Sequence, residues 1–166
     1  MLDHPAVARV RAALREGGVS ADVVVLDDHA RTAASAAEQL GVPVAAIANS
    51  LVFAVPDDGD PAGRRPLLVL ASGGHRVNTS LVAEELGVPR LDRADPQFVR
   101  ETTGFVIGGV APVGHATDFP VVVDEDLAQH PEVWAAAGHP RTVFRTTFDE
   151  LVRVTGGRPM RVATAG

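Results

Sequence analysis

Residues 103–115 carry the pattern in this chain that points most directly to chemistry. Four glycines and a proline interrupt an otherwise apolar run. Glycine tolerates positive φ and lets another molecule approach the main chain, and proline stiffens a loop by fixing φ. Such a loop can bind a small molecule through its backbone N–H groups. The alternative is a tight connection between two core strands, and the loop alone leaves both interpretations open.

The common nucleotide and hydrolase motifs do not match this loop. Residues 107–114 lack both the G-x-G-x-x-G pattern and a G-K-[ST] ending, and they lead toward an expected strand instead of opening a helix. A serine hydrolase is also disfavoured, because the chain has no G-x-S-x-G sequence and Ser50 lies inside an apolar run.

The amino-acid composition excludes several further kinds of catalytic and binding site. The chain has no cysteine, which excludes disulfides, thiolate metal sites and a cysteine nucleophile. All 15 basic residues are arginine, so a lysine base or Schiff base is excluded as well. The net charge of −6 argues against broad neutralisation of a long nucleic acid. It leaves open the binding of one short RNA end.

Three isolated polar residues are further candidates. His115 closes the glycine loop, whereas the other histidines lack the spacing of metal ligands, so we expect neither a metal nor a cofactor. Asp124 follows the β-branched run 121–123 and is a candidate to point into a cavity. Arg76 precedes an expected helix and could pair with a phosphate or with a carboxylate such as Asp124.

Hydrophobic periodicity and helix-stop signals predict the elements that must position these residues. The expected strands cover 22–26, 45–55, 67–71, 119–123 and 142–145, and the expected helices cover 5–16, 32–40, 78–86, 96–103, 131–137 and 147–156. Strict βαβ alternation fails between the second and third strands. We therefore expect a single α+β domain over residues 1–166, with a curled, barrel-like mixed sheet of about six strands surrounded by about six helices.

The N-terminus begins like a capped helix and shows no basic region followed by an apolar stretch. No apolar run is long enough to cross a membrane. The expectation is a cytoplasmic protein with neither a membrane nor DNA as a partner.

Taken in order, ten short segments resemble the superfamily of YbaK and the prolyl-tRNA synthetase editing domain, which includes free-standing trans-editing deacylases. Each segment alone is weak evidence for the family, but the order and spacing that the segments share with it make the combined resemblance specific. The matching segments are 36–42, 47–53, 68–70, 74–77, 86–88, 103–105, 108–114, 123–125, 137–138 and 149–151.

The resemblance implies hydrolysis of the ester between a mischarged amino acid and the 3′ end of tRNA, with tRNA(Pro) the expected type. The family's G-x-x-x-P loop falls on Gly108 to Pro112, where Gly108 and Gly109 could hold the ester carbonyl and stabilise its oxyanion. The nucleophile would be water or a group of the substrate. The implied partners are the acceptor end of an aminoacyl-tRNA and a tRNA synthetase.

One position departs from the family. Its usual functional lysine precedes the Ser/Thr-Leu of the second strand, and here that position is Asn49. Asparagine donates and accepts hydrogen bonds but carries no charge. The expected catalytic residues are Asn49, Gly108, Gly109 and Asp124, and the expected substrate-binding residues are Ser50, Arg76, Pro112 and His115. The alternative is a non-catalytic module of the same fold that binds a free amino acid, an aminoacyl-adenosine or another small ligand.

Overall fold

The computed structural model of the protein describes residues 2–27 and 32–163. In chain order, its elements are α1 (Pro5–Glu16), β1 (Val23–Val25), α2 (Ala33–Leu40), the 3₁₀ turn η1 (Val44–Ala46), β2 (Ile47–Pro56), β3 (Arg64–Ser72), α3 (Thr79–Leu86), β4 (Asp92–Arg93), α4 (Pro96–Thr103), β5 (Val121–Asp124), the 3₁₀ turn η2 (Glu125–Gln129), β6 (Val133–Ala136), β7 (Thr142–Thr146), α5 (Phe148–Thr155) and β8 (Arg158–Met160).

One mixed sheet organises the molecule, with strand order β1–β7–β6–β2–β3–β5–β8 and with β4 paired to β2. β2 and β3 form the long antiparallel pair at its centre. β5 runs parallel to β3 on one side, and β6 runs parallel to β2 on the other. Because no described pairing joins β1 to β8, the curled sheet stays open and does not close into a barrel.

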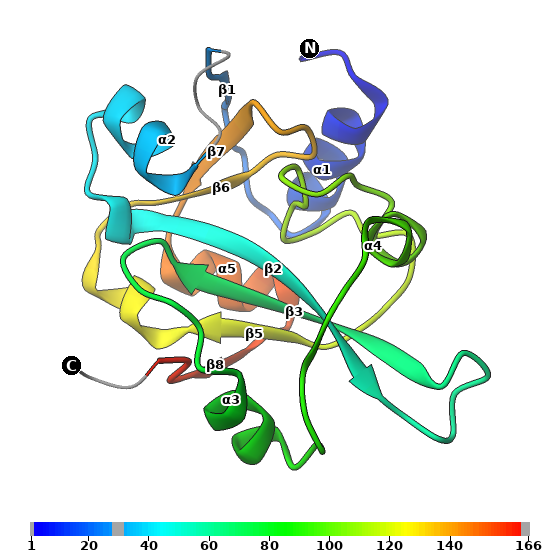
Figure 1. The fold of residues 1–166 in the computed structure, drawn as a ribbon. Coiled ribbons are helices and arrows are strands. Elements are labelled where there is room, and N and C mark those ends of the chain that lie inside the picture. The colour runs from blue at the N-terminus through cyan, green and yellow to red at the C-terminus, as the bar shows by residue number, and fades with distance from the viewer. Residues whose placement is uncertain (1, 28–31, 164–166) are drawn as a thin grey trace.

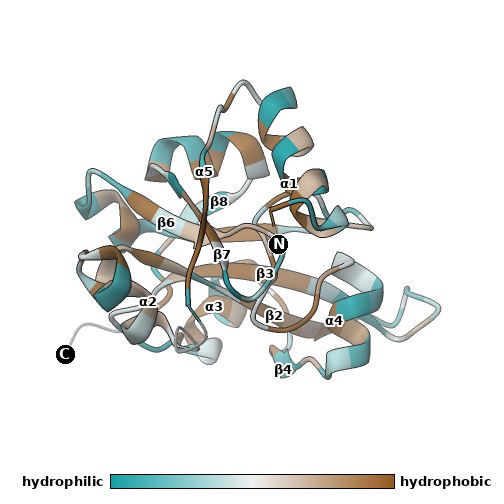
Figure 2. Ribbon diagram, turned by 90° about the horizontal axis from the view of Figure 1, so that it is seen from above, coloured by the Kyte–Doolittle hydropathy of each residue, from teal (hydrophilic) through white to brown (hydrophobic). Residues whose placement is uncertain are grey.

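Helices cover both faces of the sheet (Figure 1). Alternate residues of β3 divide between two cores, as the period of a strand requires. Leu68 and Leu70 belong to the larger core with residues of α1, α4 and α5. Val69 packs on the opposite face with Val82 of α3. The apolar colour in Figure 2 is accordingly concentrated in the central strands, while the helices turn hydrophilic residues outward.

Helix ends follow the local signals in the sequence. Leu-Gly-Val sequences end both α2 and α3, and their glycines, Gly41 and Gly87, adopt φ values of 69° and 70°. This left-handed conformation is the usual glycine helix stop. Asp95 begins α4 by accepting a hydrogen bond from the Phe98 N–H at 2.8 Å. The expected boundaries of these helices are confirmed within a residue or two.

The mixed α+β class is confirmed, but the expected helix at 131–137 is wrong. Residues 133–136 form the strand β6, which pairs with β2 and β7 and alternates between buried and half-buried positions. Its alanines favour a helix locally, and the two neighbouring strands override that preference. The described residues therefore hold five helices and eight strands, with the two-residue β4 and three-residue β8 also unforeseen.

Candidate functional site

β2 has an unpaired stretch on the edge that faces away from β3. On this edge it pairs with β6 only at Ile47 and Ala48, and with β4 only at Phe53 and Ala54. In the described residues, positions 49–52 have no strand neighbour there. A strand directs the N–H and C=O groups of alternate residues to each side, so backbone polar groups of this stretch lack a ladder partner.

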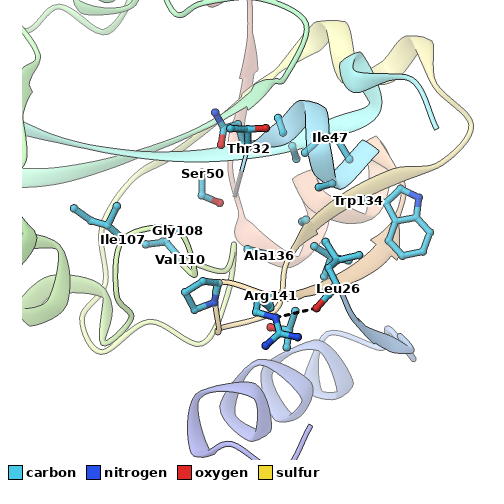
Figure 3. A pocket seen from close by; sticks show the side chains of 18 residues that line it. Leu26, Thr32, Ile47, Ser50, Ile107, Gly108, Val110, Trp134, Ala136 and Arg141 are labelled. Carbon is cyan, nitrogen blue, oxygen red and sulfur yellow. Dashed lines mark hydrogen bonds between the residues drawn. The ribbon is translucent and has the colours of Figure 1, made fainter. Parts of the chain in front are cut away.

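A cavity of about 640 Å³, here called the edge cavity, lies beside this unpaired stretch. Its walls come from α2, the start of β2, the 107–110 segment, β6 and the 140–143 segment. Figure 3 shows Ser50, Gly108, Val110 and Arg141 around this space. Its volume is in the range of ordinary small-ligand sites.

The expected site residues Asn49, Ser50 and Gly108 all line the edge cavity. Asn49 is exposed and Ser50 is half-buried. Consecutive side chains on a strand point to opposite faces, so the cavity reaches around the unpaired edge of β2. The sequence placed these three residues together only through the family resemblance, and in the structure all three line the same cavity.

Two residues that line the edge cavity each have a buried side-chain polar atom without a hydrogen-bond partner. The two atoms are the Ser50 Oγ and the Trp134 Nε1, and they are the only such side-chain atoms in the described part of the chain. Buried polar groups in native proteins are nearly always hydrogen-bonded, so exceptions call for an explanation such as a ligand or an ordered water. Both exceptions among the described residues are in side chains of residues that line the same cavity.

The two glycines of the loop have different roles. The Gly109 N–H donates to the Val106 carbonyl at 2.9 Å and so closes a turn. A Cβ on Gly109 would lie 2.9 Å from both the His139 carbonyl carbon and the Pro140 nitrogen. Gly108 has a φ of 90° and lines the cavity, and the described residues supply no acceptor for its N–H. Gly109 therefore shapes the loop, and Gly108 can offer its donor to a ligand.

Pro112 and His115 lie elsewhere, on a second cavity of about 480 Å³ near the ends of α1 and α5. The His115 Nε2 lies 2.7 Å from the Ala111 carbonyl oxygen, and its ring centroid lies 4.6 Å from that of Phe119. Burial lowers the pKa of His115 below its ordinary value of 6.5, although the hydrogen bond to Ala111 opposes the shift. A neutral ring that donates from Nε2 thus holds the loop that follows Gly108.

Asp124 is buried, but the edge cavity's lining does not include it. Its carboxylate accepts the Ser72 N–H at 2.9 Å and the Asp126 N–H at 3.0 Å, and it contacts the His75 Nε2 at 2.5 Å. These bonds join the ends of β3 and β5.

The suggested pairing of Arg76 with Asp124 is wrong. His75, the neighbouring residue in the sequence, occupies that place, and Arg76 is exposed and makes no ion pair within the described residues. His75, Asp124 and Asp126 also form a group whose ligand atoms lie within 4.8 Å of one another, close enough to hold a metal ion. Both ring nitrogens of His75 already contact these carboxylates, at 2.5 Å and 3.3 Å.

Arg141 is not among the site residues expected from the sequence, yet it lines the edge cavity. It is the one charged residue among the described residues that line the edge cavity. No motif around it gave a signal, because its position depends on how the turn before β7 packs against the glycine loop.

The chain is similar to several known proteins. A family model described as "Aminoacyl-tRNA editing domain" matches residues 27–154. Protein YwhH of Bacillus subtilis is 32% identical over 130 residues, which are 78% of each chain. The "Putative Cys-tRNA(Pro)/Cys-tRNA(Cys) deacylase EbsC" of Enterococcus faecalis is 24% identical over 138 residues, covering 83% of this chain and 80% of EbsC.

A solved structure of "a putative trans-editing enzyme for prolyl tRNA synthetase" superposes with a TM-score of 0.84 at 41% identity. The match covers 97% of this chain and 98% of the other. No helix in the described ranges combines the length and apolar character needed to span a bilayer. With a family match that includes β2, the glycine loop and β6, the chain belongs to the aminoacyl-tRNA editing domain family.

Proposed function

We propose that this protein is a free-standing deacylase that hydrolyses the ester between a wrong amino acid and the 3′ end of a tRNA, with mischarged tRNA(Pro) as its substrate. One observation carries the proposal. Asn49 and Gly108 line the edge cavity together with Ser50 and Trp134, the two described residues that have a buried side-chain polar atom without a hydrogen-bond partner. The similarity to EbsC and to the trans-editing enzyme supports the choice of tRNA.

The reaction needs an oxyanion site more than it needs a nucleophilic side chain. A water oxygen bonds to the ester carbonyl carbon, the bond between that carbon and the ribose oxygen breaks, and the ribose oxygen leaves with a proton given up by the water. Negative charge develops on the carbonyl oxygen, and preorganised donors stabilise it. The Gly108 N–H is one such donor, and the Asn49 amide can orient the substrate or add a second donor.

The other expected residues hold the loop and the neighbouring strands in place and do not contact the ester themselves. Gly109 holds the loop against the 139–140 backbone, and His115 and Pro112 stiffen the chain beyond it. Asp124 joins the ends of β3 and β5, near the C-terminal end of the strand that pairs with β2. The exposed Ile107 adds an apolar surface at the cavity. The acceptor end of the tRNA is the proposed partner, and a prolyl-tRNA synthetase is a candidate to deliver it.

A second candidate function uses the same cavity to bind a ligand without catalysing a reaction. Asn49 is uncharged where the resemblance places a lysine, which favours a module that only binds a free amino acid or an aminoacyl-adenosine. Incubation with a panel of mischarged tRNAs, following release of the amino acid, separates the two. Release above the uncatalysed rate supports the deacylase. No release, together with a rise in melting temperature on adding a free amino acid or adenosine, supports the binding module.

The Gly108→Val variant tests the loop's role in that assay. Valine at this position fills the cavity wall and blocks approach to the N–H, so we expect a loss of about 100-fold or more in deacylation, as for removal of an oxyanion donor. Gly63→Val is the matched control, because Gly63 has a similar φ of 75°, lies in the β2–β3 turn and has open space around its side-chain position. A folded Gly108→Val protein with full activity would show that the loop is only a connection.

A further inference from the structure

The main-chain groups of Ser50 point to the unpaired edge of β2. The Ile47 carbonyl accepts a hydrogen bond from the Gly73 N–H at 2.8 Å, so Ile47 faces β3. Alternate residues of a strand direct their N–H and C=O groups to opposite sides, and the register of β2 with β3 is unbroken from Ala48 to Pro56. Ser50, three positions after Ile47, therefore faces the other edge, where no described strand pairs with it.

The hydroxyl of the same residue also lacks a partner. The Ser50 Oγ is buried and makes no hydrogen bond within the described residues. Ser50 lines the edge cavity, and Figure 3 shows its side chain directed from β2 toward the segment that carries Gly108 and Val110. Main-chain and buried side-chain polar groups are nearly always paired in native proteins. Three such groups without a described partner, all on one residue that lines a cavity, indicate a place for a ligand.

The charge of the proposed substrate narrows the contacts that it needs. An aminoacyl ester carries an α-ammonium group, which needs hydrogen-bond acceptors when it leaves water. Among the described residues, the lining of the edge cavity contains no carboxylate. Neutral oxygens of this lining therefore have to accept from the ammonium group. The Ser50 carbonyl is such an oxygen, and it faces the edge beside which the cavity lies.

An aminoacyl group has the same array of polar atoms as a strand residue, with a nitrogen and a carbonyl on one α-carbon. Two residues that face each other in an antiparallel ladder exchange two hydrogen bonds, each from the N–H of one to the C=O of the other. An extended aminoacyl group beside Ser50 can form the same pair. Its ammonium then donates to the Ser50 carbonyl, and its ester carbonyl accepts from the Ser50 N–H.

We propose that the main chain of Ser50 binds the aminoacyl group of the substrate in this way, in the place of the strand neighbour that β2 lacks. This assignment rests on the proposed function. It defines the ligand class as α-aminoacyl groups with a free ammonium, and it makes the Ser50 N–H a second donor to the carbonyl oxygen beside the Gly108 N–H. The contacts use only atoms that all amino acids share, so selection among amino acids falls to the other walls of the cavity.

Two substitutions at Ser50 separate the main chain from the hydroxyl in a binding assay. The probe is 3′-alanylamino-3′-deoxyadenosine, an amide that resists hydrolysis and carries the smallest chiral amino acid. Ser50→Ala removes only the hydroxyl. Ser50→Pro also removes the N–H, and it leaves the ladder with β3 intact because this N–H faces the other edge. We expect Ser50→Pro to bind the probe about 5- to 10-fold more weakly than Ser50→Ala, as for one neutral hydrogen bond.

Val52→Pro is the matched control. The Val52 N–H faces the same edge of β2, but Val52 is not part of the cavity lining. This variant should bind the probe as the wild type does, and melting temperatures show whether each variant is folded. Equal affinities of folded Ser50→Pro and Ser50→Ala would overturn the assignment.

A second probe tests the ammonium contact and needs no proline variant, so it decides the question if Ser50→Pro unfolds. The matching lactyl amide replaces the ammonium by a hydroxyl of similar size. The wild type should bind the alanyl probe about tenfold more tightly, the difference between a charge-assisted and a neutral hydrogen bond. This ratio should persist in Ser50→Ala and in Asn49→Ala, because both keep the Ser50 carbonyl. A ratio near one in the wild type, or its loss in either variant, contradicts the main-chain contact.

Hydrolysis of mischarged tRNA separates this assignment from the proposed function. Ser50→Pro should have a kcat about 100-fold below that of Ser50→Ala, because its missing N–H is a donor to the developing oxyanion. A wild type that releases no amino acid, yet gives both binding results, would contradict the deacylase and leave the Ser50 contacts standing. An active wild type whose Ser50→Pro and Ser50→Ala variants bind and hydrolyse equally would support the deacylase and overturn the Ser50 assignment.

Discussion

At the scale of single residues, the candidate site consists mainly of uncharged groups, and their position beside the unpaired edge of β2 is what makes them candidates for binding. Asn49 and Ser50 are ordinary strand residues, and they are candidates for the site because no described strand pairs with β2 beside them. The Ser50 Oγ is buried without a partner, which would cost stability in an isolated protein.

The Asn49→Lys variant tests how much the missing charge matters. An ammonium near the developing oxyanion should raise kcat/KM on mischarged tRNA by roughly tenfold, as expected for a charge-assisted hydrogen bond. Asn49→Gln is the matched control, because it lengthens the side chain without adding a charge. Both variants are measured in the deacylation assay. Lower activity in Asn49→Lys than in Asn49→Gln would mean that the cavity is adapted to asparagine.

At the scale of elements, the glycine loop and the turn before β7 act as one unit. The loop is remote in sequence from residues 139–142, yet the two backbones lie in contact because Gly109 has no side chain. The misassigned β6 belongs to the same unit, since it joins the edge of β2 to the turn that carries Arg141. A helix at 131–137 would have removed this wall of the cavity.

Gly109→Ala should separate these two backbones. Its Cβ would lie 2.9 Å from the His139–Pro140 peptide, which is closer than such atoms approach, so the loop must shift. We expect a loss of about 1–3 kcal/mol in the free energy of unfolding, typical of overpacking, and a loss of deacylation. Chemical denaturation measures the first effect. Gly59→Ala is the control, because Gly59 meets only the end of the Asp57 side chain at 3.4 Å, and equal stability of the two variants would contradict the packing argument.

At the scale of the whole molecule, an open curled sheet creates the site and helices on both faces stabilise it. The two cores on either face of β3 fix the position of β2, and β2 loses its described strand neighbour where β6 ends. Stability of the loop region is also linked to pH through His115. Its lowered pKa means that the unfolded chain binds a proton there more readily than the folded chain.

The His115→Gln variant measures this linkage. The stability contributed by the neutral ring is fully present above the ordinary pKa of 6.5 and is lost as pH falls from there toward the lowered value in the folded protein. The wild type should therefore lose more of its free energy of unfolding than His115→Gln when the pH is lowered through 6.5. Glutamine keeps an N–H donor for the Ala111 carbonyl but does not titrate. Parallel losses in the two proteins, measured by denaturant titration on both sides of pH 6.5, would contradict the argument.

The local features of this protein were already readable in its amino-acid sequence. Helix stops at Leu-Gly-Val, the cap at Asp95 and the buried run of β3 depend on neighbouring residues, and local propensity is sufficient for them. The glycine-proline loop and the family were equally visible, because they are ordered patterns along the chain. Only the tertiary structure decided that 133–136 is a strand, that His75 rather than Arg76 contacts Asp124, and that Arg141 lines the same cavity as Gly108. Those outcomes depend on contacts between segments far apart in the sequence, for which burial and strand pairing outweigh local preference.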